Sequence, residues 1–362
     1  SDLDSLTDPG HPDLSLGLGQ ETRGNKMKKV LFASTALAAL AVGGVASAAD
    51  TGIALFGDAR LGLGYNINND GSLNGDEDLH AVSRVRFGVN MTGETDSGIS
   101  FGATIRADNA SNGQGGTSGQ SAGEVFVSGS WGTLTFGDTN GADEQWVGDV
   151  PGNFALTGFD DIHETLFLSN GGGVEDSDFV GNSEARPTVR YDVDVAGFGL
   201  SLSSNRDLED ITVGAGYSAD FAGGTWSVGL GYNDFSDFDI DSVDTDGEPV
   251  VLTLDGGKQY SAGLNAEFEQ FGFGAVYTKA ESDGDDEFET LSVGGSYGFD
   301  AFTVGAFYHT FLSGGDLVDG DDAYALTAKY DLGGGASVNG GVGRAWGNDD
   351  DDNNNDNKKQ NT

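Results

Sequence analysis

The sequence contains no cysteine, only 5 prolines, few basic residues and a single long apolar run. Without cysteine the chain can form neither a disulfide nor a thiolate metal site. Its 17 basic residues stand against 59 acidic ones, which gives a net charge of −42. Such a charge repels the phosphates of nucleic acid. The composition therefore excludes nucleic acid as a partner.

Residues suited to catalysis are also scarce. His80, His163 and His309 are the histidines after the apolar run, and none lies in a recognisable nucleophile motif with serine. The glycine-rich segments lack the Gly-Lys-Ser/Thr of a phosphate loop. The stretch "DSVDTDGEPV" resembles part of a calcium loop, but Thr253 stands where the bidentate glutamate belongs. We expect no enzyme and no cofactor, with loop carboxylates as candidates for loose Ca²⁺ binding.

The apolar run predicts an export signal that does not stand at the start of the chain. Lys28 and Lys29 precede it, and Ala46-Ser47-Ala48 follows it in the pattern of a signal-peptidase site. We therefore expect a Sec signal peptide at 27–48. Residues 1–26 are polar and unperiodic, which indicates translated upstream sequence that is not part of the native protein. A genuine polar N-terminal arm is the alternative.

The remaining chain is rich in residues that argue for order. It carries most of the 61 glycines, 22 phenylalanines and 10 tyrosines, and such an aromatic content does not fit disorder. After Ala49 the dominant pattern is a period of two. In "HAVSRVRFGVNM", Val85 and Phe87 alternate with Arg84 and Arg86. This alternation is typical of strands with one apolar and one polar face.

About fifteen segments share this pattern, and short turns alternate with longer Asp-, Asn- and Gly-rich connections. These features predict an all-β fold over 49–346, a transmembrane antiparallel up-and-down β-barrel with short periplasmic turns and long extracellular loops. A secreted β-sandwich does not explain so many polar, glycine-rich faces, and a calcium-bound β-solenoid requires a nonapeptide repeat that is absent. The strands are expected near 53–65, 81–92, 98–108, 123–130, 132–139, 187–196, 199–206, 211–220, 225–234, 258–268, 272–281, 288–298, 301–311, 322–331 and 336–345.

Three segments carry a family resemblance: "SRVRFGV" (83–89), "GSWGTLTFGD" (129–138) and "YDVDVAGFGLSLSSN" (191–205). They resemble strands of the alphaproteobacterial general diffusion porins, the sixteen-stranded trimeric type. The resemblance implies a homotrimer among outer-membrane lipid and lipopolysaccharide. It also implies a third loop that folds into the lumen and narrows the channel.

The segment from about 140 to 186 is the longest connection and fits that third loop. Within it, Phe159, Ile162 and Leu166 have the spacing of a short amphipathic helix. Its acidic residues are expected to form one side of the channel constriction. A solvated acidic loop outside the barrel is the alternative. The predicted acidic residues are Asp143, Glu144, Asp160, Asp161 and Glu164.

Strand parity predicts the opposite side of the constriction. Five arginines fall on the polar face of their strands, and an arginine facing lipid at midplane costs about 2–4 kcal/mol. We therefore expect these arginines to face the lumen, where they and the loop acids would create a field across the channel. Local salt bridges that only stabilise the loop are the alternative. The predicted basic residues are Arg60, Arg84, Arg86, Arg106 and Arg190.

Together these features predict an outer-membrane general diffusion porin that passes ions and small hydrophilic solutes through a water-filled channel. The alternatives are a barrel enzyme, such as a protease or lipase, and a plugged adhesin or structural barrel. Barrels of this kind use an even number of strands. The tail at 347–362 has no apolar residue and supplies no strand. We expect a missing sixteenth strand and a tail that is truncated or out of frame, with a fifteen-stranded barrel as the alternative.

Overall fold

Nearly all of the described chain is β-strand. The computed structural model describes residues 28–37, 52–67, 79–109, 118–152, 167–170, 187–243, 249–284, 287–313 and 322–346. Sixteen strands pair in one antiparallel sheet, and fifteen of them follow residue 49. These fifteen are β2 (Gly52–Ile67), β3 (Leu79–Glu94), β4 (Ser100–Asn109), β5 (Ser118–Gly129), β6 (Gly132–Gly137), β7 (Pro187–Val195), β8 (Phe198–Asn205), β9 (Ile211–Phe221), β10 (Gly224–Phe235), β13 (Gly257–Phe268), β14 (Phe271–Ser282), β15 (Glu287–Phe299), β16 (Phe302–Ser313), β17 (Asp322–Gly333) and β18 (Ala336–Trp346).

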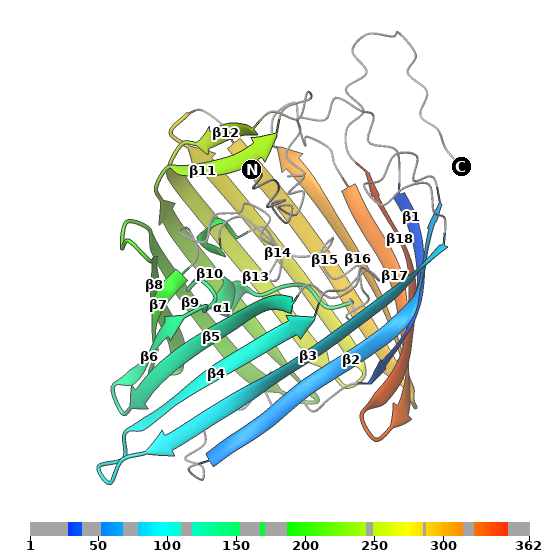
Figure 1. Cartoon of the computed structure of the whole chain (residues 1–362), viewed down its shortest axis with the longest axis horizontal. Helices are drawn as coiled ribbons and strands as arrows, with labels where there is room; N and C mark the ends of the chain where they lie inside the picture. The colour runs from blue at the N-terminus through cyan, green and yellow to red at the C-terminus, as the bar shows by residue number, and fades with distance from the viewer. Residues whose placement is uncertain are drawn as a thin grey trace, which may run out of the picture.

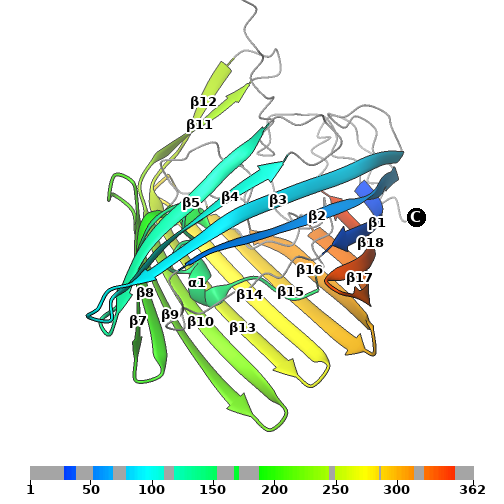
Figure 2. The same cartoon turned by 60° about the horizontal axis from the view of Figure 1, so that its bottom comes forward.

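The fifteen strands are the fifteen that the alternation predicts, and each pairs with its neighbours along the chain in up-and-down order. Short turns at one rim alternate with longer connections at the other. Figures 1 and 2 show the sheet curved into a barrel, with β2–β5 on one side and β13–β16 on the other. The predicted barrel architecture is confirmed.

The sheet made by these strands is open between β18 and β2. The segment β1 (Lys28–Leu37) lies in this place and pairs antiparallel with both edge strands. It belongs to the region where the sequence predicts the core of a signal peptide, so the structure has a strand where none is expected. Unpaired backbone groups at two sheet edges are costly in lipid, and an apolar segment of strand length can satisfy both edges. The division into signal peptide, barrel and tail stays a prediction.

The outer face of the barrel is apolar. Along β9, the exposed Ile211 and Val213 alternate with the buried Thr212 and Gly214. Rings stack near the short-turn rim, where Phe302 contacts neighbouring aromatic side chains. A polar inside and an apolar outside with aromatic rims are the pattern of a barrel that faces lipid.

The short turns are tight because their residues adopt positive φ angles. Between β7 and β8, Ala196 has φ 56° and Gly197 has φ 88°. Two successive residues in this region give the primed turns that match the twist of antiparallel strands. Strand register on either side of such a two-residue loop is therefore fixed by the turn.

Besides β1, four short elements were not predicted from the sequence. The connection after β10 contains a separate hairpin of β11 (Phe238–Val243) and β12 (Pro249–Leu254). The long third connection contains a one-turn helix, α1 (Glu144–Val147), and a 3₁₀ turn, η1 (Leu168–Asn170). Neither helix of the described part is long and apolar enough to cross a membrane.

Candidate functional site

Four of the five predicted arginines lie on the neighbouring strands β2, β3 and β4. Arg60 is the cross-strand partner of Arg84, and Asp58 is that of Arg86. Arg106 pairs with the second residue after Arg86. Directly paired residues project from the same face of a sheet. The four guanidinium groups and the Asp58 carboxylate therefore share one face.

That face is the inner one. Leu61 and Phe87, which lie next to these arginines in the chain, are exposed on the outer face, whereas Arg60 is only 6% exposed. Nη2 of Arg84 lies 3.9 Å from Oδ2 of Asp58. A role for these arginines in a channel constriction remains a prediction.

Arg190 on β7 is engaged in a different way. Its Nε lies 3.0 Å from Oδ2 of Asp192, and its Nη1 donates to the backbone oxygen of Asn140 over 2.8 Å. Asn140 is the first residue of the part of the third loop that runs inside the barrel. We call residues 140–152 the inner segment. Arg190 thus holds the start of the inner segment to the wall.

The inner segment begins with the helical turn α1. Oδ1 of Asp143 accepts from the backbone N–H of Glu144 over 2.9 Å, and Gly148 ends the turn with φ 64°. The turn lies against β9, β10 and β13, inside the barrel (Figure 2). In the strand order these strands stand about halfway round the sheet from the arginine-bearing β2–β4.

Glycines allow this close approach. At five inward positions of β8, β9 and β10, an added Cβ would come within 3.0 Å of the inner segment, so no larger residue fits without displacement. The atoms of the inner segment that stand in the way belong to Ala142, Asp143, Trp146 and Val147, and at Gly231 the side chain of Ser261 on β13 is equally close. The five glycines are Gly199, Gly214, Gly216, Gly229 and Gly231.

The contact continues along the wall as far as β17. Further glycines on β13–β16 face Val147, Val150, Pro151 and Gly152 in the same way. The hydroxyl of Thr327 on β17 donates to the backbone oxygen of Gly152. An apolar cluster fills the remaining space between the loop and the wall. Its members are Val147, Val150, Phe167, Val276, Phe307 and Ala325.

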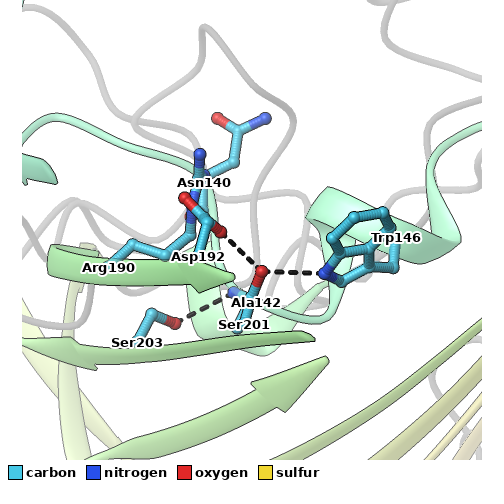
Figure 3. A network of polar contacts seen from close by, with 7 residues as sticks. All are labelled: Asn140, Ala142, Trp146, Arg190, Asp192, Ser201 and Ser203. Atoms are coloured by element: carbon cyan, nitrogen blue, oxygen red, sulfur yellow. Dashed lines mark hydrogen bonds and ion pairs between the residues drawn. The ribbon is translucent and has the colours of Figure 1, made fainter. Parts of the chain in front are cut away.

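A chain of hydrogen bonds joins the inner segment to β7 and β8, as Figure 3 shows. Nε1 of Trp146 donates to Oγ of Ser201 over 2.7 Å, and Ser201 donates to Asp192 over 2.5 Å. Asp192 is the carboxylate that pairs with Arg190. The backbone N–H of Ala142 donates to Oγ of Ser203 over 2.9 Å. Polar and apolar contacts therefore fix the same segment.

The two predicted acids of the inner segment lie close to the wall. Asp143 is 1% exposed and accepts from Oγ of Ser169 over 2.6 Å, while no donor from the described residues reaches its Oδ2. Burial raises the pKa of the Asp143 carboxyl, against the lowering effect of its hydrogen bonds. Glu144 accepts from the side chain of Asn140 over 2.9 Å. Asp143 does not contact the lumen, contrary to the sequence prediction.

The remaining acids of the predicted constriction, Asp160, Asp161 and Glu164, lie outside the described residues, as does the helix expected around Phe159–Leu166. No pattern in the sequence indicated Trp146 as an attachment point. Its partner Ser201 is 55 positions away along the chain. The glycines on alternate positions of β9 and β10 were the available signal.

One serine–histidine pair occurs among the described residues. Oγ of Ser292 lies 2.7 Å from Nδ1 of His309, and Ser292 is 0% exposed. A serine sealed from solvent cannot attack a substrate, so the pair acts as a packed hydrogen bond. Within the described ranges, no group of three or more His, Asp or Glu side chains is arranged to hold a metal ion.

An antiparallel barrel with an apolar outside, a polar inside and a chain segment folded within it defines the class of outer-membrane channel barrels. Residues 33–353 match the Gram-negative porin family. The chain belongs to that family and is an outer-membrane channel.

Individual relatives agree with this assignment. A porin of Rhodobacter capsulatus is 31% identical over 316 residues, which cover 80% of this chain and 93% of the relative. A refined porin structure is similar at TM-score 0.53 and 24% identity, and the match covers 82% of this chain and 100% of that one. A multiply substituted porin of Rh. blastica is similar at TM-score 0.50 and 16% identity, covering 88% and 98%. The two structures support the fold.

Proposed function

We propose that this porin is a general diffusion channel. Ions and small hydrophilic solutes pass through water between the inner segment and the arginines of β2–β4. One observation carries the proposal: the turn α1 of the inner segment lies on the wall about halfway round the sheet from Arg60, Arg84, Arg86 and Arg106. A segment on one wall and charge on the other narrow a lumen without closing it.

The acidic side of the constriction is assigned to Glu144 and to Asp160, Asp161 and Glu164. Asp143 is not included because its carboxylate is buried. Arg190 is treated as an attachment group because both its ion pair and its hydrogen bond tie the loop to the wall. The net charge of −42 enriches cations at the channel mouth, which favours modest cation selectivity.

The assembly and cellular route belong to the same proposal. The chain is exported through the signal peptide at 27–48 and forms homotrimers surrounded by outer-membrane lipid and lipopolysaccharide. The channel works by diffusion and needs no cofactor or catalytic group. Loose Ca²⁺ binding by the loop carboxylates is a separate prediction, which titration of the purified protein with Ca²⁺ would test.

The test is electrical. Purified protein in a planar bilayer should give discrete conductance steps, with a reversal potential that shows cation preference at low salt and less at high salt, since screening shortens with ionic strength. The triple variant Asp160→Asn, Asp161→Asn, Glu164→Gln should reduce that preference.

A triple variant at the short-turn rim is the matched control. Asp96→Asn, Asp300→Asn, Asp331→Asn removes the same charge from exposed positions far from the inner segment. It should leave the reversal potential close to that of the parent. The absence of conductance steps would refute the channel proposal, and equal effects of the two triple variants would refute the acidic constriction.

A further inference from the structure

We propose that Trp146 is the positioning residue of this channel: its indole, held in a socket of wall glycines, sets where the inner segment stands and therefore how wide the passage is. The socket consists of Gly199 on β8 and of Gly214 and Gly216 on β9. This inference rests on the proposed function, because it assigns a width-setting role to a loop inside a conducting lumen.

The first support is the shape of the socket. A Cβ on Gly199 or Gly216 would overlap the six-membered ring of the indole, and a Cβ on Gly214 would overlap its Cδ1 edge and the backbone of Ala142. Glycines in a strand weaken it unless a close approach requires them. Three of them beneath one side chain, on two adjacent strands, indicate that the wall is built to receive that side chain.

The second support is the polar attachment. Nε1 of Trp146 donates to Ser201, Ser201 donates to Asp192, and Asp192 pairs with Arg190. Arg190 then returns to the inner segment through the backbone oxygen of Asn140. The relay in Figure 3 therefore holds the segment at two points, six residues apart, from one pair of strands.

The third support is that the turn α1 is too short to hold its own position. The turn α1 has only four residues, and isolated helices of that length are unstable in water. Its place must therefore come from contacts with the wall. Trp146 has the largest side chain of the turn, and its indole lies against Gly199 on β8 and against Gly214 and Gly216 on β9. Without the indole, the turn loses both its shape fit and the side-chain hydrogen bond from Trp146 to Ser201 on β8.

The test compares conductance with barrel integrity. Trp146→Ala should release the segment towards the lumen. The mean single-channel conductance should fall by roughly twofold with frequent brief closures, because flow depends on the open cross-section. Swelling of protein-containing liposomes in sugars of increasing size should show a lower size limit. Trp146→Phe, which keeps a ring but loses the N–H, and Ser201→Ala should both lie between parent and Trp146→Ala.

A double-mutant cycle separates positioning from general damage. Gly216→Ala alone should disturb conductance because its Cβ displaces the indole, and it should add nothing in the Trp146→Ala background, where the socket is empty. Two controls are matched in chemistry: Trp226→Ala, which removes an outer-face indole packed on Tyr217, and Gly298→Ala, where a Cβ has room. Both controls should conduct like the parent.

The outcomes are distinguishable. If the parent conducts and the folded Trp146→Ala and Gly216→Ala variants show parental conductance, noise and size limit, the positioning role is wrong while the channel stands. If Gly216→Ala is equally disruptive with and without Trp146, the socket interpretation is wrong. If Trp146→Ala does not fold, the milder Trp146→Phe, Ser201→Ala and Gly216→Ala variants decide by the same criteria. A parent without conductance overturns the proposed function and this inference together.

Discussion

Two walls of the barrel look alike from outside and differ inside. On β2 and β10 the exposed Leu61 and Leu230 have nearly the same exposure, 66% and 63%. Their inward neighbours differ completely: Arg60 stands beside Leu61, whereas Gly229 and Gly231 flank Leu230. One wall presents charge to the lumen, and the other presents bare backbone on which the inner segment lies.

The difference shows which face of a strand is free to carry function. Contact with lipid requires the outer side chains of every strand to be apolar where the strand crosses the hydrocarbon, whatever lies behind them. The inner side chains have no such common requirement. They can therefore be charged where solutes pass and absent where another part of the chain must approach. The outward-facing residues of each strand therefore indicate the barrel fold, and the inward-facing residues between them indicate the functional site.

The largest effect is expected from disrupting the apolar outer face, which the two walls share. Leu230→Arg places a guanidinium near the middle of β10 on the outer face, and Leu61→Arg does the same on β2. Each should destabilise the barrel by about 2–4 kcal/mol if it lies at the bilayer midplane. Urea unfolding of protein inserted in lipid vesicles measures the loss.

Leu230→Phe and Leu61→Phe are the controls for this prediction, since they keep the outer face apolar at a similar size. They should cost much less than the arginine variants. A Leu230→Arg barrel as stable as the parent would show that β10 does not face lipid. Unequal losses on β2 and β10 would show that the two outer faces have different surroundings.

The fifteen strands were predictable because contact with lipid requires the outer face of each strand to be apolar. Every second residue of a strand faces lipid and must be apolar. In "SRVRFGV" the apolar residues and the arginines therefore separate onto two faces, and this can be read without knowing any contact. The same parity places Arg84 and Arg86 on the inner face. Strand β1 was not predictable, because the run after Lys29 does not alternate and was assigned to export.

The inner segment shows where prediction from the sequence stops. A turn of four residues cannot display a helical period, so α1 left no signal. Ser201 joins Trp146 only after β7 and β8 have folded beside the loop, and no local pattern encodes such a pair. A partial signal did exist in "VGAGY" (213–217) and "VGLGY" (228–232). There the polar parity holds only glycine, as expected where a second layer of chain packs on the strand.

An intermediate effect is expected from altering the charged wall alone. Replacing both Arg84 and Arg86 with glutamine removes two positive charges from the inner face of β3 and should shift the reversal potential towards cations. The shift should be largest at low salt and should shrink as the screening length falls to roughly 3 Å near 1 M salt. Unfolding by urea should change little, because glutamine keeps polar contacts on that face.

Lys258→Gln is the control for the position of the charge, and it removes one positive charge where the arginine pair loses two. Lys258 is exposed and shares the outer face of β13 with Tyr260, so its charge does not line the lumen. It should not move the reversal potential. If the arginine pair behaves like Lys258→Gln, the arginines of β3 serve local salt bridges and do not shape the ion path.

The smallest effect is expected from pH, where the inner segment packs on the glycines of the wall. Asp143 is buried there, and desolvation raises the pKa of its carboxyl. A carboxyl whose pKa is higher in the folded protein than when released binds more protons in the folded state. Stability of the packed inner segment should therefore fall as pH rises from the ordinary value of 3.8 towards the raised value, and stay level above it.

Asp143→Asn keeps an acceptor for Ser169 and the N–H of Glu144 but cannot titrate, so its stability should lack this component. The difference between the melting temperatures of parent and variant, followed from acid to neutral pH, isolates the Asp143 contribution from all other carboxyls. Parallel pH curves for the parent and Asp143→Asn would show that the carboxyl is hydrated in the folded barrel and that the inner segment does not pack on the glycine wall at this point.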